Sequence, residues 1–234
     1  MSTVLPEPAP GVHRPVRVWD LPTRLFHWAL ALTLAGSVVS AKIGGNAMVW
    51  HFRFGAVVLA LLAFRLLWGF VGGTWSRFTR FVYPPGTVLR YLRGGSLPAD
   101  HHDVGHSPLG SLSVFGLLAV LLLQLGTGLV ADDEIANLGP LNRFVPSGLA
   151  LQATSWHKSY GQWLVLALVA LHVAAIAYYL LRKRQNLMLP MIVGDKPLPA
   201  GTPASADGMQ QRLLALLLLA LCAALAVWVA GLGG

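Results

Sequence analysis

The chain has 234 residues, of which 55% are hydrophobic and only 11% are charged. A soluble domain carries about 25% charged residues, so the composition excludes an ordinary soluble protein and predicts a membrane protein. The net charge of +8 would suggest nucleic-acid binding in a soluble protein, but here the arginines flank apolar segments, where they indicate membrane topology. The single cysteine, Cys222, excludes an internal disulfide, a cysteine-based zinc or iron–sulfur site and covalent c-type haem.

Five apolar segments are long enough to cross a bilayer, which takes about 20 residues. In chain order they are residues 23–41, 49–71, 109–131, 156–181 and 212–232. We therefore predict an all-α membrane protein with a four-helix transmembrane bundle and a fifth, C-terminal transmembrane helix. The expected divisions are an N-terminal segment, the four-helix core, a linker and the fifth helix: residues 1–22, 23–194, 195–211 and 212–234. Residues 85–92 are expected to form a short helix lying in the membrane interface.

The basic residues of the connecting segments predict the orientation. The segments expected on one side are rich in them: Arg14, Arg17, Arg24, Arg77, Arg80, Arg90, Arg93, Arg182, Lys183, Arg184, Lys196 and Arg212. The segments on the other side have few: Lys42, Arg53, Arg143 and Lys158. Because cytoplasmic loops carry the excess of lysine and arginine, we expect a cytoplasmic N-terminus and a periplasmic C-terminus in a bacterial inner membrane.

Four of the eight histidines lie in the predicted spans: His27, His51, His157 and His172. His157 and His172 share the fourth span and stand 15 residues apart, which is about 22 Å along a helix. Because neighbouring spans run in opposite directions, His27 reaches the depth of His172, and His51 reaches the depth of His157. Two neutral imidazoles are usual axial ligands of haem iron, so the sequence predicts two haems, each held by one of these pairs.

Two glycines accompany the histidines of one pair. Gly55 follows His51 by four residues, and Gly161 follows His157 by four, so each glycine shares a helix face with its histidine. Either the glycines leave room for a flat porphyrin, or they serve tight helix packing, which is common in membranes.

Three arginines are candidates for binding the anionic haem propionates: Arg24, Arg53 and Arg65. Arg24 lies one turn before His27, and Arg65 lies inside the second span, where an unpaired charge is costly. The alternative for these arginines is contact with phospholipid headgroups or a role in topology. A metal cluster of His101, His102 and His106 has no diagnostic spacing and is not expected.

Residues 18–28, with the sequence VWDLPTRLFHW, resemble the opening of bacterial cytochrome b561 proteins and of NiFe-hydrogenase b-type cytochrome subunits. Shorter resemblances follow in the order of that superfamily: GHSPLG at 105–110, WHKSYG at 156–161 and MIVGDK at 191–196. The resemblance covers about residues 16–197. It implies a four-helix bundle with two bis-histidine haems b, with ligands on the first, second and fourth helices, and electron exchange with the quinone pool.

The leading hypothesis is a transmembrane di-haem b-type cytochrome that transfers electrons between the quinone pool and a periplasmic redox partner or small redox molecule. Within the same class, the alternative is the membrane-anchor cytochrome b subunit of a NiFe hydrogenase or similar complex. Candidate borders of a quinone site are Trp19, Asp20 and Arg24 on one side and Trp50, Gln152 and Trp156 on the other. The fifth helix departs from the four-helix core, and either docks a partner or anchors the C-terminus.

A proton channel or transporter that uses intramembrane histidines is the hypothesis from another class. It requires polar chains and carboxylates within the spans. None of the five span cores contains an aspartate or glutamate, so the di-haem hypothesis is preferred. No catalytic residue is predicted, and quinone-linked oxidoreductase activity stays open.

Overall fold

The computed structural model describes residues 13–95 and 104–233. Within them, five helical segments are long and apolar enough to cross a membrane, as the sequence predicts. They are α1 (Leu21–Ile43), α2 (Met48–Val71), α4 (Pro108–Leu129), the continuous span Ser147–Leu181 and α8 (Met209–Gly231). The fourth span consists of α5 (Ser147–Ser155), a π-helical turn (Trp156–Gly161) and α6 (Gln162–Leu181). The fold is therefore mostly helical and contains the expected fifth helix.

The helix starts follow from capping residues that the sequence already shows. Asp20 caps α1 by accepting a hydrogen bond from the Thr23 amide, and Pro22 lies in the first turn. Ser107 caps α4 in the same way, with Pro108 as the first helical residue. An acceptor at the cap and a proline in the first turn are the standard helix start, because the first amides have no partner inside the helix. At the other end of α1, Gly44 adopts a φ of +69°, which favours glycine.

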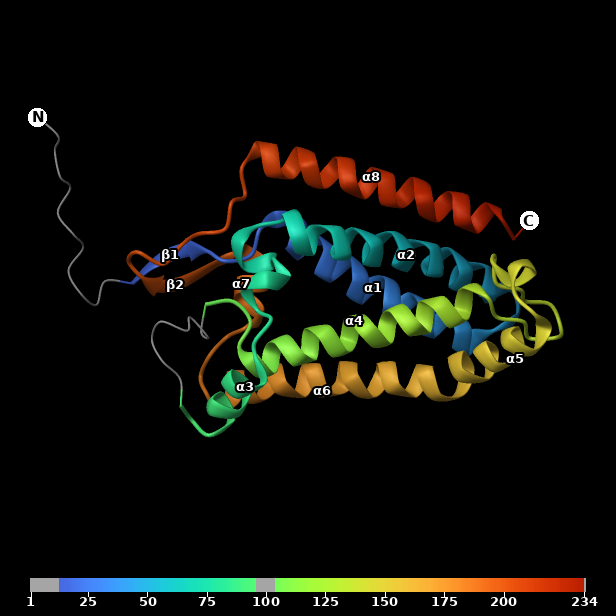
Figure 1. Ribbon diagram of the computed structural model, residues 1–234, viewed down its shortest axis with the longest axis horizontal. Helices are drawn as coiled ribbons and strands as arrows, with labels where there is room; N and C mark the ends of the chain where they lie inside the picture. Colours follow the sequence, from blue (N-terminus) through green and yellow to red (C-terminus); the bar gives the residue numbers. More distant parts are fainter. Residues whose placement is uncertain (1–12, 96–103, 234) are drawn as a thin grey trace, which may run out of the picture.

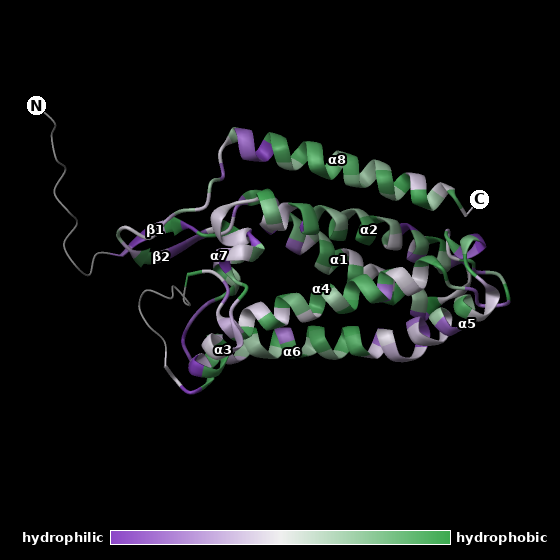
Figure 2. Ribbon diagram, viewed as in Figure 1, coloured by the Kyte–Doolittle hydropathy of each residue, from purple (hydrophilic) through white to green (hydrophobic). Residues whose placement is uncertain are grey.

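The long helices pack as two pairs with α8 beside one of them (Figure 1). α1 lies along α2, α4 lies along α6, and α8 runs along the side of α2 away from α4. One apolar core joins α1, α2 and α8, and includes Phe26, Phe64 and Ala226. A second core joins α2, α4 and α6 through Leu62, Leu121 and Val165. Apolar residues predominate along the long helices (Figure 2), and many of them are exposed, among them Leu32, Leu171 and Leu217, which is typical of helices that contact lipid.

A small extramembrane layer caps one end of the bundle. β1 (His13–Arg17) pairs antiparallel with β2 (Asp195–Pro199), with Arg17 opposite Asp195. The short helices α3 (Pro85–Leu92) and α7 (Met188–Val193) lie at the same end (Figure 1). We call this end the ribbon end, and the opposite end, formed by residues 130–147 and α5, the loop end. A helix is thus present at residues 85–92, as predicted. The segment 195–211, expected as a linker, begins with a strand, because it pairs with residues 13–17. That pairing joins residues almost 180 positions apart, so no local pattern predicts it.

The carboxylate of Asp20 fastens the ribbon end of the bundle. Asp20 is fully buried, and its oxygens accept hydrogen bonds from the Trp68 indole at 3.0 Å and the Ser76 hydroxyl at 2.5 Å. The backbone amides of Thr23 and Gly73 also donate to it, at 2.8 and 3.2 Å. Because a buried charge is tolerated only when its hydrogen bonds are made, this set of donors fixes the start of α1 against the end of α2.

A second set of charges fastens the start of α8. Asp207 accepts a hydrogen bond from the Leu21 amide and pairs with Arg17 at 2.5 Å and with Arg212 at 3.3 Å. Arg17 also pairs with Asp195 at 2.6 Å, so the ribbon, α1 and α8 meet at one point. Burial alone raises the pKa of Asp207, but the Leu21 amide and the two arginines outweigh it, and the net pKa is lowered.

We expect Asp207→Asn to lower the free energy of unfolding by about 1–3 kcal/mol at pH 7, as for hydrogen bonds to a charged group. Because the folded-state pKa of Asp207 is lowered, its contribution is present above the ordinary carboxyl pKa of about 3.9 and disappears as the pH falls through the folded-state value. Thermal unfolding in detergent between pH 7 and pH 3 measures the difference, which should narrow with acid.

Asp195→Asn is the matched control. Asp195 shares Arg17, but its side chain is 36% exposed against 7% for Asp207, and it does not contact α8. A smaller loss is therefore expected. An equal destabilisation by Asp207→Asn at pH 3 and pH 7 would contradict an ionic role for Asp207.

Candidate functional site

The structure brings the four predicted ligands together as two pairs. The rings of His27 and His172 lie 6.3 Å apart between centroids, near the ribbon end of α1 and α6. The rings of His51 and His157 lie 6.0 Å apart near the loop end. A metal–imidazole bond of about 2 Å, plus about 1 Å from each nitrogen to its ring centre, places two axial imidazoles about 6 Å apart across one metal. Both separations fit a single iron between two rings.

Hydrogen bonds fix which nitrogen each loop-end ring offers. The Nδ1 atom of His51 lies 2.9 Å from the Ser37 carbonyl, and Nδ1 of His157 lies 2.8 Å from the Gln124 carbonyl. A carbonyl oxygen only accepts, so each Nδ1 carries the proton and donates it. The Nε2 atom of each ring then keeps its lone pair for a metal, and the bond at Nδ1 strengthens it as a ligand.

A local irregularity of the fourth span positions His157. The chain makes a π-helical turn from Trp156 to Gly161, a form that frequently marks functional sites in helices. The Gln124 amide donates to the His157 carbonyl at 2.9 Å, which satisfies an acceptor within this turn. Across from the ring, a Cβ on Gly128 would lie 2.7 Å from His157 Cε1, so only glycine fits there. Gly128 carries no sequence signal, because it lies far from His157 in a helix where small residues are common.

A cavity of about 770 Å³ opens beside His51 and His157. It is lined mainly by apolar residues of α1, α2, α4 and α8 and by the connection after α4. Gly55 borders this cavity and has open space where a Cβ would stand. Gly161 differs, because a Cβ there would collide with the Gln124 side chain. Gly55 therefore fits the prediction of porphyrin space, and Gly161 fits its alternative of tight packing.

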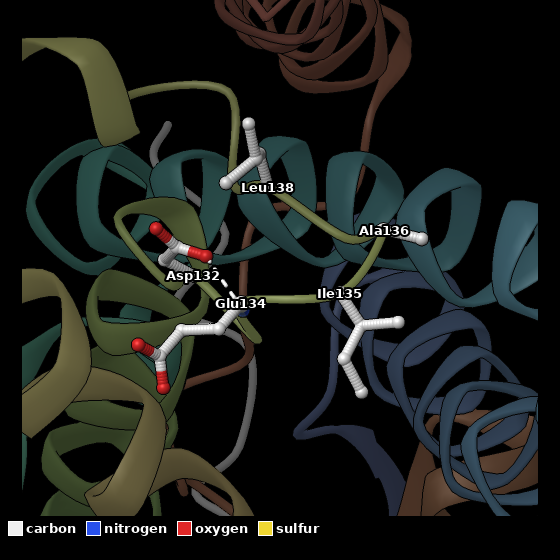
Figure 3. A pocket seen from close by; sticks show the side chains of 5 residues that line it. All are labelled: Asp132, Glu134, Ile135, Ala136 and Leu138. Atoms are coloured by element: carbon white, nitrogen blue, oxygen red, sulfur yellow. Dashed lines mark hydrogen bonds between the residues drawn. The ribbon is translucent and has the colours of Figure 1, made fainter.

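A smaller pocket of about 260 Å³ lies on the connection between α4 and α5, at Asp132, Glu134, Ile135, Ala136 and Leu138. Figure 3 shows that these side chains diverge from the loop instead of pointing toward one centre. The hydrogen bond drawn there is internal, from the Glu134 amide to Asp132 at 2.7 Å. This pocket offers no converging polar groups for a ligand.

Buried polar atoms without a hydrogen-bond partner gather at the two histidine levels. In the part of the chain that the structure describes, they belong to Arg24, His27, Arg65 and His106 near the ribbon end and to Gln124 and Trp156 near the loop end. Buried polar groups in native proteins are nearly always paired, so each such atom needs an explanation, for example a ligand. Their distribution fits two cofactors, one at each pair.

Arg65 is the most informative of these residues. Its side chain is only 4% exposed, its Nη1 atom has no partner, and its guanidinium lies 4.7 Å above the ring of Phe78. The carboxylate of Asp20 is the nearby anion, but its oxygens accept hydrogen bonds from other donors. A buried cation with an unpaired nitrogen is costly, so a further hydrogen-bond acceptor is expected beside Nη1. A haem propionate has the required charge and hydrogen-bonding atoms.

The other two arginines differ from Arg65 in their surroundings. Arg24 donates through Nη1 to the Ile192 carbonyl at 2.6 Å, which ties α1 to α7, while its Nε stays unpartnered. Arg53 is exposed, stacks 4.8 Å over Trp50 and does not line the loop-end cavity. The headgroup alternative therefore suits Arg53 better than a propionate.

His106 joins the ribbon-end surroundings, which its position in a connecting loop did not predict. Its ring lies between Trp19 and Phe81, with centroids at 4.7 and 4.5 Å. Burial, followed by the nearby charge of Arg65, lowers the pKa of His106 to about 3, so the ring is neutral at pH 7. His101 and His102, the other histidines of the cluster that was considered and not expected, lie outside the described residues. No group of three metal-binding side chains occurs among the residues described.

The residues proposed to border a quinone site fall into different environments. Trp19 is buried against His106, and the oxygens of Asp20 are occupied by the donors described above. Trp50 and Gln152 are exposed, whereas the Trp156 indole nitrogen is buried and unpartnered. Asp20 is thus a structural residue, and neither group forms a converging polar slot.

Comparison with known proteins places the chain among membrane cytochromes. Residues 18–194 match the family described as prokaryotic cytochrome b561. The chain is 27% identical to the probable Ni/Fe-hydrogenase 1 B-type cytochrome subunit of Escherichia coli (strain K12), over 67% of this chain and 80% of that protein. It is 26% identical to the probable Ni/Fe-hydrogenase B-type cytochrome subunit of Azotobacter chroococcum mcd 1, over 76% and 87%. No solved structure matches it.

Gly128→Ala tests how the loop-end pair is positioned. The added methyl group must displace the His157 ring, so we expect loss or altered ligation of the haem predicted there, with the ribbon-end site unchanged. Gly126→Ala is the matched control on the same helix, because a Cβ at Gly126 meets nothing within 4 Å. Electron paramagnetic resonance of the oxidised protein measures both sites. Equal effects of the two substitutions would contradict the proposed contact.

Proposed function

Because the chain belongs to the prokaryotic cytochrome b561 family, we propose that it is a di-haem b-type cytochrome that carries electrons across the membrane. One haem b is bound by His27 and His172, and the other by His51 and His157. Electrons move between the quinone pool and a redox partner or small redox molecule on the periplasmic side. The family match confirms the resemblance inferred from the sequence and the electron-transfer role of a multi-pass membrane cytochrome b.

The observation that carries the proposal is the spacing of the two histidine pairs, at 6.3 and 6.0 Å between ring centroids. Four long-range partners from α1, α2 and the fourth span meet at separations suited to bis-histidine ligation, one pair near each end of the bundle. A histidine proton pathway has no comparable need for paired rings. It also needs carboxylates or other polar relays, and the described spans contain no aspartate or glutamate.

The bound haems supply reversible one-electron chemistry, and the protein residues set where and how readily it occurs. The Ser37 and Gln124 carbonyls hold the loop-end imidazoles in one tautomer. Arg65 places positive charge near the ribbon-end pair and favours the reduced state there. The apolar helices exclude water between the two sites. Together these residues define an electron-transfer path with two haem sites at fixed positions.

The basic residues of the ribbon-end connections support a cytoplasmic ribbon end and a periplasmic loop end. Neither set of candidate residues forms a converging polar slot, so the end that binds the quinone is assigned by experiment. A quinol analogue, titrated against the spectra of the two haems, assigns the end whose haem responds first.

A hydrogenase-type partner is the second candidate, because the similar curated proteins are named as Ni/Fe-hydrogenase cytochrome subunits. In that case a partner subunit delivers electrons to the loop-end haem, and the quinone pool accepts them. Reduction of the purified cytochrome by quinol alone supports a cytochrome that works without a hydrogenase partner. Reduction that requires hydrogen and a purified hydrogenase supports the subunit role.

The haem assignment predicts two haems b per chain in a pyridine haemochrome assay. We expect His157→Ala to lose the loop-end haem and His172→Ala to lose the ribbon-end haem, with the other haem retained in each variant. His13→Ala, in the ribbon and remote from both pairs, should keep both. If the parent protein contained no haem after expression with adequate haem supply, the proposed electron-transfer function would be excluded.

Arg65→Gln should lower the midpoint potential of the ribbon-end haem by tens of millivolts, because removing a buried positive charge disfavours the added electron. A change of about 59 mV corresponds to a tenfold change in a one-electron equilibrium. Arg53→Gln is the matched control on the same helix, since Arg53 is exposed. Potentiometric titration measures both haems. If Arg53→Gln shifted the midpoint potential of the ribbon-end haem more than Arg65→Gln does, the proposal that Arg65 lies beside this haem would be contradicted.

A further inference from the structure

The fifth transmembrane helix takes part in the loop-end cavity. Ala226, Val229 and Ala230 of α8, and Gly233 beyond it, line the same cavity as His51 and His157. Val229 and Ala230 follow Ala226 by three and four residues, so the three residues lie on one helix face. The outer third of α8 is thus a wall of the predicted haem site, although α8 lies outside residues 18–194 that match the family.

α8 is fixed at both ends and along its length. At the ribbon end, Asp207 joins Arg17 and Arg212 just before the helix begins. Along the helix, Ala215, Cys222 and Ala226 are buried in the core shared with α1 and α2. At the loop end, a Cβ on Gly233 would lie 2.8 Å from the Cα of Pro140, so the chain end contacts the connection after α4. A helix attached at three places keeps a constant position beside the cavity.

The other face of α8 is suited to lipid. Leu217, Leu221 and Trp228 are each about 60% exposed and share no side with the buried alanines. Small residues next to α2 and large apolar residues away from it are the usual arrangement of a helix that packs inside a membrane protein and meets lipid outside. The small-residue face is fully used by α2 and the cavity, so it is not free to dock another subunit.

We propose that α8 is a permanent fifth wall of the loop-end haem site, which closes the cavity beside α2 and limits the access of water to the haem held by His51 and His157. This inference rests on the proposed function, because it requires a haem at that pair. Solvent exposure is one of the determinants of haem potential, so α8 sets the potential of one haem and leaves the other unaffected.

The test uses the whole chain and two matched pairs of variants in which an alanine of α8 is replaced by phenylalanine. Ala226→Phe introduces a ring at the cavity wall, and Ala215→Phe introduces one at a similarly buried position eleven residues earlier that does not line the cavity. Ala230→Phe and Ala220→Phe form the second pair at exposed positions, of which only Ala230 lines the cavity. The second pair decides the result if a buried phenylalanine prevents folding.

Haem content and the two midpoint potentials are measured for each variant, with the loop-end haem identified as the one lost in His157→Ala. We expect Ala226→Phe and Ala230→Phe to lose at least half of the loop-end haem or to shift its potential alone. Ala220→Phe should match the parent, and Ala215→Phe, which disturbs the packing of α8 on α1 and α2, should change the loop-end haem less than Ala226→Phe does. Unchanged loop-end haem in both cavity variants, or equal changes in both haems, would overturn the role of α8. A parent without haem would instead refute the proposed function, and this inference with it.

Discussion

An imidazole ring inside a membrane bundle needs a partner for each of its polar nitrogens, because hydrocarbon offers none. At the loop end the protein supplies half of these partners, through the carbonyls of Ser37 and Gln124. The other nitrogen of each ring is the one that the proposed haem iron between His51 and His157 would use. The helix spacing, the π-helical turn and Gly128 all serve this one requirement, since a small rotation of the fourth span would separate the rings.

At the ribbon end, the described residues do not supply these partners. There the unpaired atoms of Arg24, His27, Arg65 and His106 surround the site, and the cation Arg65 is deeply buried. The loop end has polar side chains but no deeply buried cation in the described chain. If each site binds the same porphyrin, this difference in charge separates their potentials and gives electron flow a preferred direction.

The sequence was sufficient for the features with a short-range signal. Hydropathy placed the five spans, and antiparallel helix geometry alone grouped the four histidines by depth. The sequence was insufficient where a feature depends on residues distant along the chain. The ribbon pairs Arg17 with Asp195, Gly128 faces His157, and α8 reaches the cavity through Ala226, and none of these contacts follows from a local pattern. For Gly161, the local pattern suggested space for a porphyrin beside His157, but the side chain of Gln124, distant along the chain, occupies that space.

The β ribbon also imposes an order on biogenesis. Its first strand leaves the ribosome early, yet its partner is separated from it by 178 residues in the Arg17–Asp195 pair. At a synthesis rate of about 5–20 residues per second, β1 waits roughly 10–40 s for β2. Four spans are translated in that interval, and α8 is not. The ribbon therefore cannot close until the four-helix core has been synthesised, and the contact of Asp207 with Arg17 cannot form until after β2 has been synthesised.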